Sequence, residues 1–244
     1  RMLVVPLERG DGGSVVHLYD FSRPAAPRLV AAIAHRGARG ELLSHAGAAG
    51  MAALADGRHL LVVGTRHSRR LDFYLSRRGE LAADGWRHLD RWDAGELETA
   101  IGDRGFGHYQ SLHLLAGRDG ALYLLGSYRR FFHQDWLDLH QLSLGRGADG
   151  QPAVRLVKVG RKHLDCSGGA ADRCNLDAGT GVYVDPDGRL RVYAIGYAAA
   201  RVAFRQPRAQ AAVPLVEFVS RGVAGSRAAR DTGAAPPPGT SPRR

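Results

Sequence analysis

The stretch DGALYLLG, residues 119–126, joins an Asp-Gly turn to a run of apolar, strand-forming residues. Asp-Gly is typical of a tight β-hairpin, because glycine accepts the positive φ that such a turn requires. The same arrangement occurs in ADGR at residues 55–58 and in PDGR at residues 186–189, so the three turns lie 63 and 68 residues apart. This spacing indicates a repeated unit that contains a hairpin.

A third strand follows each of the first two hairpins, at residues 71–75 and 137–142, with Asp72 or Asp138 in its second position. A fourth strand follows in turn. Four antiparallel strands in a unit of about sixty residues predict an all-β protein, a β-propeller built of four-stranded blades. Residues 3–34 fit the last three strands of such a unit, so we expect about three and a half blades in an incomplete or open propeller.

No stretch keeps a helical period, and the apolar runs are short and bounded by Gly, Asp and Pro. We expect residues 1–220 to form the partial propeller and the Arg, Ala, Pro and Gly residues of 221–244 to be a disordered tail. No apolar run is long enough to predict a membrane span. The expected strands are residues 3–7, 14–20, 28–34, 50–54, 59–64, 71–76, 86–92, 110–115, 121–127, 137–144, 154–159, 181–184, 190–195 and 214–219.

The net charge of +10 suggests a polyanion partner, but its distribution argues against a specific one. Residues 201–244 carry eight arginines against Glu217 and Asp231, so most of the excess lies near the C-terminus. Residues 129–133 interleave basic and aromatic side chains as single-stranded nucleic-acid sites do, yet they are one short stretch. We therefore expect weak, salt-sensitive polyanion binding by the tail and no specific nucleic-acid recognition.

Polar residues in the loops that lead into the innermost strands are the candidate ligand-binding residues, because propellers bind ligands where these loops ring the central channel. They are His45; His108, Tyr109 and Gln110; and Asn175 and Asp177. The competing explanation is that these side chains satisfy backbone groups and water in the channel. Asn175 and Asp177 also stand at alternate positions, as calcium ligands do, although turn chemistry explains them equally. No other cofactor, no other metal and no catalytic residue is predicted.

Two cysteines, Cys166 and Cys174, flank a short Gly-rich stretch. A disulfide between them would remove about 2 to 3 kcal/mol of chain entropy from the unfolded state, and it would suit an exported protein. The alternatives are two free thiols, or a metal site shared with His163 that lacks the CxxC spacing of strong zinc sites.

Four stretches of the sequence resemble a group of uncharacterised, secreted bacterial β-propeller proteins. They are SRRLDFY at residues 68–74, YQSLHLL at 109–115 with DGALYLLG at 119–126, DWLDL at 135–139, and CNLDAGTGVYV at 174–184. The resemblance covers roughly residues 2–219 and implies the propeller fold and export from the cell. It implies no activity and no site residue.

The sequence is compatible with two functions. The first is a secreted binding or interaction scaffold for a carbohydrate or protein ligand. The alternative is a hydrolase, for instance a glycosidase with paired carboxylates at the channel. The loops that lead into the innermost strands offer one carboxylate, Asp177, which favours the binding scaffold.

The predicted disulfide between Cys166 and Cys174 is tested by a thiol titration of the denatured, unreduced protein. We expect no free sulfhydryl before reduction and two afterwards. Two free sulfhydryls in the unreduced protein would contradict the bridge.

Overall fold

The computed structural model describes residues 2–9, 13–64, 69–103, 105–117, 120–130, 134–164, 176, 179–195 and 215–220. Within these ranges the regular structure is β-strand, apart from the single-turn 3-10 helices η1 (Ala83–Gly85) and η2 (Ala94–Glu96). No helix in the described part of the chain is long and apolar enough to cross a membrane. The all-β prediction is therefore confirmed.

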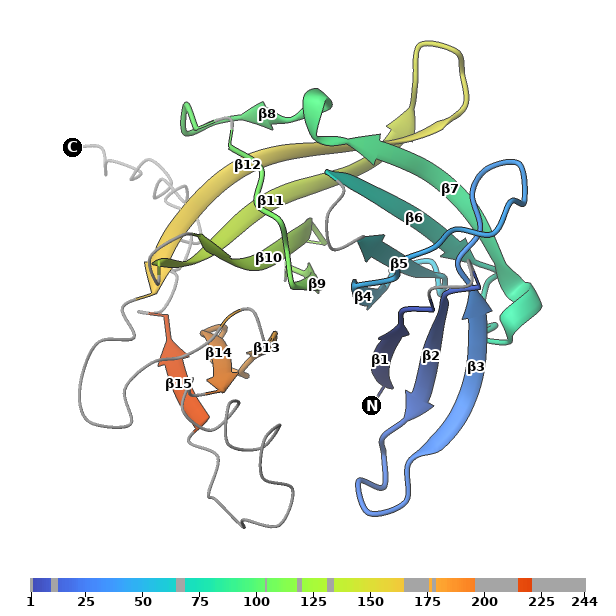
Figure 1. The fold of residues 1–244 in the computed structure, drawn as a ribbon, viewed down its shortest axis with the longest axis horizontal. Coiled ribbons are helices and arrows are strands. Elements are labelled where there is room, and N and C mark those ends of the chain that lie inside the picture. The colour runs from blue at the N-terminus through green and yellow to red at the C-terminus, as the bar shows by residue number, and fades with distance from the viewer. Residues whose placement is uncertain are drawn as a thin grey trace, which may run out of the picture.

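The strands form four antiparallel sheets, called blades 1 to 4, arranged around a common centre (Figure 1). Blade 1 contains β1 (Met2–Leu7), β2 (Val15–Asp20) and β3 (Arg28–Ala34). Blade 2 contains β4 (Ala48–Ala53), β5 (His59–Gly64), β6 (Arg70–Ser76) and β7 (Trp86–Asp93). Blade 3 contains β9 (Ser111–Ala116), β10 (Leu122–Arg130), β11 (Gln134–Arg146) and β12 (Pro152–Leu164), with the short β8 (Glu98–Thr99) added in parallel to β12. Blade 4 contains β13 (Thr180–Val184), β14 (Leu190–Ile195) and β15 (Leu215–Val219).

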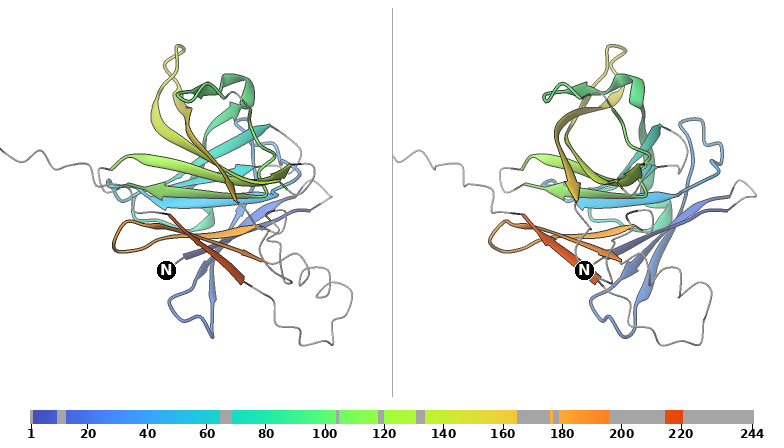
Figure 2. Two further views of the ribbon diagram at one scale, coloured as in Figure 1. Left: turned by 90° about the vertical axis from the view of Figure 1, so that its left-hand side faces the viewer. Right: turned by 60° about the vertical axis from the view of Figure 1, so that its left-hand side comes forward.

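Figure 2 shows blades 2 and 3 lying above blades 1 and 4 in both of its views. Three apolar clusters join neighbouring blades: one between blades 1 and 2, the largest between blades 2 and 3, and one between blades 3 and 4. Phe73, Trp92 and Leu124 are fully buried in the largest cluster. Burial of each such side chain stabilises the fold by about 1.5 to 3 kcal/mol, so the blades are held mainly by their facing surfaces.

The glycines of the three Asp-Gly dipeptides lie where the sequence predicts turns. Gly57, Gly120 and Gly188 have φ values of 83°, 78° and 79°, the left-handed conformation that favours glycine. Each lies between the first and second strands of its blade. These glycines therefore mark the first hairpin in three of the four blades.

A β-bulge identifies which strands blade 1 contains. The register shifts between Phe73 and Tyr74 in β6, and between Leu139 and His140 in β11, each time in the pairing of a third strand with a fourth. The pairing of β2 with β3 shows the same shift, between Leu18 and Tyr19. This places β2 and β3 third and fourth, and β1 second, in agreement with the prediction that residues 3–34 are the last three strands of a blade.

The Ala-rich segment 46–55 contains strand β4, although alanine and glycine are weak strand formers. Close packing explains the glycine at position 50. A Cβ atom there would lie 2.5 Å from the carbonyl oxygen of Leu112, so only glycine lets β4 and β9 meet backbone to backbone. Tertiary packing therefore decides the structure of this segment.

The aspartate repeated in each third strand is buried. Asp72 accepts hydrogen bonds from Arg91 Nε at 2.9 Å, His88 Nε2 at 2.9 Å and His35 Nε2 at 3.3 Å. Burial alone raises the pKa of Asp72, but the hydrogen bonds from His35, His88 and Arg91 outweigh it and hold the pKa well below its ordinary value. His35 follows β3 directly, so this carboxylate fixes the connection from blade 1 to blade 2.

Asp138 is the equivalent residue of blade 3 and is fully buried. It accepts hydrogen bonds from Arg161 Nε at 2.6 Å and from the Tyr109 hydroxyl at 2.8 Å, and Lys158 Nζ lies 3.2 Å away. Tyr109 ends the connection from blade 2 to blade 3, and Lys158 and Arg161 also donate to the carbonyl of Gly105 in that connection. One carboxylate therefore joins the third strand, the fourth strand and the entering loop.

Replacement of Asp138 tests this role. Asp138→Asn keeps the shape of the side chain but leaves the buried Lys158 and the partly buried Arg161 with only the more exposed Asp103 as a counter-ion, so we expect a loss of about 3 to 5 kcal/mol of unfolding free energy in urea titrations. The matched control is Asp84→Asn, at an exposed position in η1. Equal stabilities of the two variants would contradict the role.

Candidate ligand-binding channel

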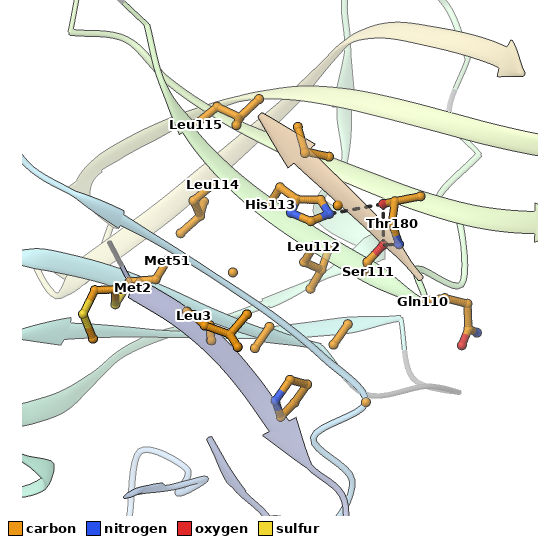
Figure 3. Close-up of a pocket in the computed structure, with 18 residues that line it drawn as sticks. Met2, Leu3, Met51, Gln110, Ser111, Leu112, His113, Leu114, Leu115 and Thr180 are labelled. Atoms are coloured by element: carbon orange, nitrogen blue, oxygen red, sulfur yellow. Dashed lines mark hydrogen bonds between the residues drawn. The ribbon is translucent and has the colours of Figure 1, made fainter. Parts of the chain in front are cut away.

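A hollow of about 440 Å³ lies where β1, β4, β9 and β13 meet (Figure 3). These are the innermost described strands of the four blades. Its walls are mainly apolar and include both methionines of the chain, Met2 on β1 and Met51 on β4. Gly47, Gly50 and Gly181 contribute backbone without a side chain, which keeps the space open.

One polar cluster lies at the side of the hollow formed by blades 3 and 4 (Figure 3). Ser111 Oγ lies 2.5 Å from Ser127 Oγ and 2.7 Å from Thr180 Oγ1, and the Thr180 amide donates to Ser111 Oγ at 3.0 Å. His113 Nε2 lies 3.2 Å from Thr180 Oγ1. Ser111 and His113 share one face of β9 because side chains alternate along a strand.

His113 is neutral at pH 7. Burial lowers its pKa to about 4, against the opposing effect of the hydrogen bond with Thr180. A neutral imidazole can donate one hydrogen bond and accept another, but it carries no charge. No described residue that lines the hollow is Asp, Glu, Lys or Arg. The described walls therefore suit an uncharged ligand.

The candidates predicted from the sequence lie in different places. Gln110 lines the hollow. His45 is exposed, has a φ of 71° and places Nδ1 2.6 Å from Glu8 Oε1. His108 is exposed outside the hollow, and Tyr109 is only 5% exposed and bound to Asp138.

Asn175 and Asp177, with the calcium site predicted for them, lie outside the described residues, as do Cys166 and Cys174. The calcium site and the disulfide therefore stay predictions. Among the described residues, no group of three or more His, Cys, Asp or Glu side chains is arranged to hold a metal ion.

Ser111, His113 and Thr180 were not among the predicted candidates. They lie on strands, whereas the prediction considered only the loops leading into those strands. Ser111 and His113 alternate with the buried Leu112 and Leu114. This alternation could have indicated from the sequence that Ser111 and His113 lie together on the less buried face of the strand. The partner Thr180 is 67 residues from His113, and no local pattern marks it.

No known protein-family model and no curated protein matches this sequence. Solved structures with some similarity include a mutant levansucrase of B. megaterium, with 10% sequence identity and a TM-score of 0.40 over 66% of this chain and 43% of that chain. Another is the levansucrase of Bacillus subtilis, with 13% identity and a TM-score of 0.35 over 61% of this chain and 41% of that chain. The chain thus spans about two fifths of the length of these enzymes.

The lowered pKa values of His113 and His140 predict acid-sensitive stability. Burial lowers the pKa of both His113 and His140 to about 4. An unfolded histidine has a pKa near 6.5. The neutral state of each ring therefore contributes to the free energy of unfolding above about pH 6.5, and this contribution is lost as the pH falls towards 4. The loss is about 3 kcal/mol for each histidine.

Urea unfolding at several pH values between 7 and 4 measures this loss. His113→Asn should reduce the loss by up to about 3 kcal/mol, because the titrating group is gone. His108→Asn, at an exposed position, is the control. The same pH dependence in His113→Asn and in the unaltered protein would contradict the neutral state of His113.

Proposed function

We propose that this protein is a binding module whose central channel holds an uncharged, largely apolar ligand. The observation that carries the proposal is the hollow at the meeting point of four strands, with apolar walls and one neutral polar cluster. Ligand sites in proteins commonly combine an apolar lining with a few fixed polar groups that orient the ligand. Gln110 and His113 are the groups best placed to do so.

The lining favours a peptide with apolar side chains, or an apolar small molecule, over a sugar. A sugar presents many hydroxyl groups and is usually stacked on aromatic rings, whereas His113 is the only aromatic ring among the described lining residues. The hydroxyl groups of Ser111, Ser127 and Thr180 already bond to one another. Few polar groups therefore remain to bind a carbohydrate.

The hydrolase alternative needs chemistry that the described walls do not supply. A retaining glycosidase uses two carboxyl groups about 5 Å apart. The described lining residues include no carboxylate, and Asp177 lies outside the described residues. The levansucrases are enzymes by name, but their TM-scores of 0.40 and 0.35 carry no activity over to this chain.

We propose export from the cell as the setting for this function. The support is the composition, with two lysines and two cysteines in 244 residues, together with the resemblance of residues 2–219 to secreted propellers. Binding outside the cell would also suit the predicted disulfide.

A calorimetric screen of uncharged peptides, apolar small molecules and glycans tests the binding function. We expect a peptide or apolar compound to bind, and His113→Leu to weaken it about 3- to 10-fold, the value of one hydrogen bond. His108→Leu makes the same change outside the hollow and should bind as the unaltered protein does.

A parallel assay follows the release of reducing sugar from sucrose and from fructan. We expect none. Turnover of a sugar that depends on a carboxylate of this chain would replace the binding function by the hydrolase alternative.

A further inference from the structure

Three hydroxyl groups form a closed triangle in the wall of the hollow where blades 3 and 4 meet. Ser111 Oγ lies 2.5 Å from Ser127 Oγ and 2.7 Å from Thr180 Oγ1, and Thr180 Oγ1 lies 3.1 Å from Ser127 Oγ. Each hydroxyl has one hydrogen to donate and two lone pairs that accept. All three contacts are hydrogen bonds only if each hydroxyl donates its one hydrogen within the triangle.

This triangle determines which nitrogen of His113 carries the ring hydrogen. Because the hydrogen of Thr180 Oγ1 stays within the triangle, Thr180 can only accept from His113 Nε2, which lies 3.2 Å away. Nε2 is therefore the N–H of the neutral ring, an assignment that follows from the hydrogen-bond pattern. A neutral imidazole has a single N–H, so His113 Nδ1 carries a lone pair and acts as an acceptor.

The acceptor nitrogen of His113 is open to the hollow. Figure 3 shows the ring with one nitrogen joined to Thr180 and the other turned away from it, into the space that the labelled residues enclose. Among the described residues, His113 Nδ1 has no hydrogen-bond partner. It also differs from the Nδ1 atoms of His35, His59 and His140, which lack a partner but are sealed from solvent. A ligand can reach His113 Nδ1 and cannot reach those three.

The surroundings of this acceptor are apolar. Leu112, Leu114 and Met51 line the hollow near His113, and Gln110 lies at one edge of the residues labelled in Figure 3. A buried donor or acceptor left without its partner costs about 1 to 3 kcal/mol. A site with one acceptor in an apolar wall therefore discriminates between ligands by whether they bring a donor to it.

We propose that the hollow binds an uncharged, apolar small molecule with one hydrogen-bond donor, a hydroxyl or an N–H group, which donates to His113 Nδ1. This names the ligand class of the proposed binding function and rests on it. The volume of about 440 Å³ is in the range of small-molecule sites. A molecule whose only polar atom is an acceptor, such as an ether, meets a lone pair at Nδ1 and binds less well.

Thr180 is a positioning residue in this arrangement, because it acts on the ligand through His113. Its hydroxyl fixes the hydrogen on Nε2, and its amide donates to Ser111 Oγ at 3.0 Å, which closes the cluster. The hydroxyl groups of the triangle bond to one another and leave the ligand to the imidazole. Specificity for a donor thus depends on a contact between two blades that lies outside the bond to the ligand itself.

NMR of the ring nitrogens of His113 tests the tautomer without any ligand, because a nitrogen that carries hydrogen and one with a lone pair differ widely in chemical shift. We expect Nε2 to carry the hydrogen and Nδ1 to carry the lone pair at pH 7. The reverse assignment would overturn the proposal whether or not any ligand binds.

Two matched pairs of probes test the ligand class by calorimetry: naphthol with its methyl ether, and indole with N-methylindole. In each pair methylation removes the donor and keeps the ring system. We expect the donor to bind about 3- to 10-fold more tightly than its methylated partner, the value of one hydrogen bond. In His113→Leu this preference should disappear. Equal binding of the two partners by the unaltered protein would contradict the proposal.

Two substitutions at Thr180 test its positioning role. Thr180→Val keeps the branched shape but removes the hydroxyl, so His113 should populate both tautomers and the preference for the donor should fall. Thr180→Ser keeps the hydroxyl and should retain the tautomer and the preference. A tautomer unchanged in Thr180→Val would show that Thr180 does not set it. If Thr180→Val does not fold, the spectrum of the unaltered protein and the probe pairs still decide the question.

The possible outcomes separate this proposal from the binding function on which it rests. If a peptide or an apolar compound of the wider screen binds in the hollow but naphthol and indole do not, the ligand class is wrong and the binding module stands. Tighter binding of the methylated partners by the unaltered protein would have the same meaning. If nothing in the screen binds, both the ligand class and the binding function are wrong.

Discussion

The buried aspartate of the third strand is the interaction on which the arrangement of the blades depends. Asp72 and Asp138 each lie opposite an arginine of the fourth strand, Arg91 or Arg161. The bulge beside each pair adds one residue to the fourth strand, so that His88 or Lys158 reaches the same carboxylate. Because His35 or Tyr109 also donates to it, the carboxylate fixes where the next innermost strand begins.

Blade 1 lacks this interaction. His17 stands at the place of the aspartate and faces Ala32, so the described residues provide no ion pair there. Val16, Leu18 and Ile33 pack against blade 2 through apolar contacts. Two hydrogen bonds from blade 2 hold the segment that follows β3: His35 donates to Asp72, and the Tyr74 hydroxyl donates to the carbonyl of Arg36 at 2.7 Å. Blade 1 is therefore anchored through the carboxylate of blade 2 and has no carboxylate of its own at this position.

The sequence predicted those parts of the fold that local chemistry determines. The Asp-Gly turns identified three blades, because a positive φ at Gly57, Gly120 and Gly188 is a local requirement. The repetition of Asp72 and Asp138 was visible, but their role was not, since the partners His35 and Tyr109 lie 37 and 29 residues away. The site was predicted least well: Gln110 follows from the order of the strands, whereas the contact of His113 with Thr180 exists only once blades 3 and 4 meet.

A double-mutant cycle between Tyr109 and Asp138 tests the central claim most directly. Tyr109→Phe, Asp138→Asn and the double variant are compared by urea unfolding, because the Tyr109 hydroxyl donates to Asp138 at 2.8 Å. The account predicts a coupling free energy of about 0.5 to 3 kcal/mol between the two side chains. Strictly additive losses would show that the carboxylate does not hold the entering loop, and they would contradict its role in the arrangement of the blades.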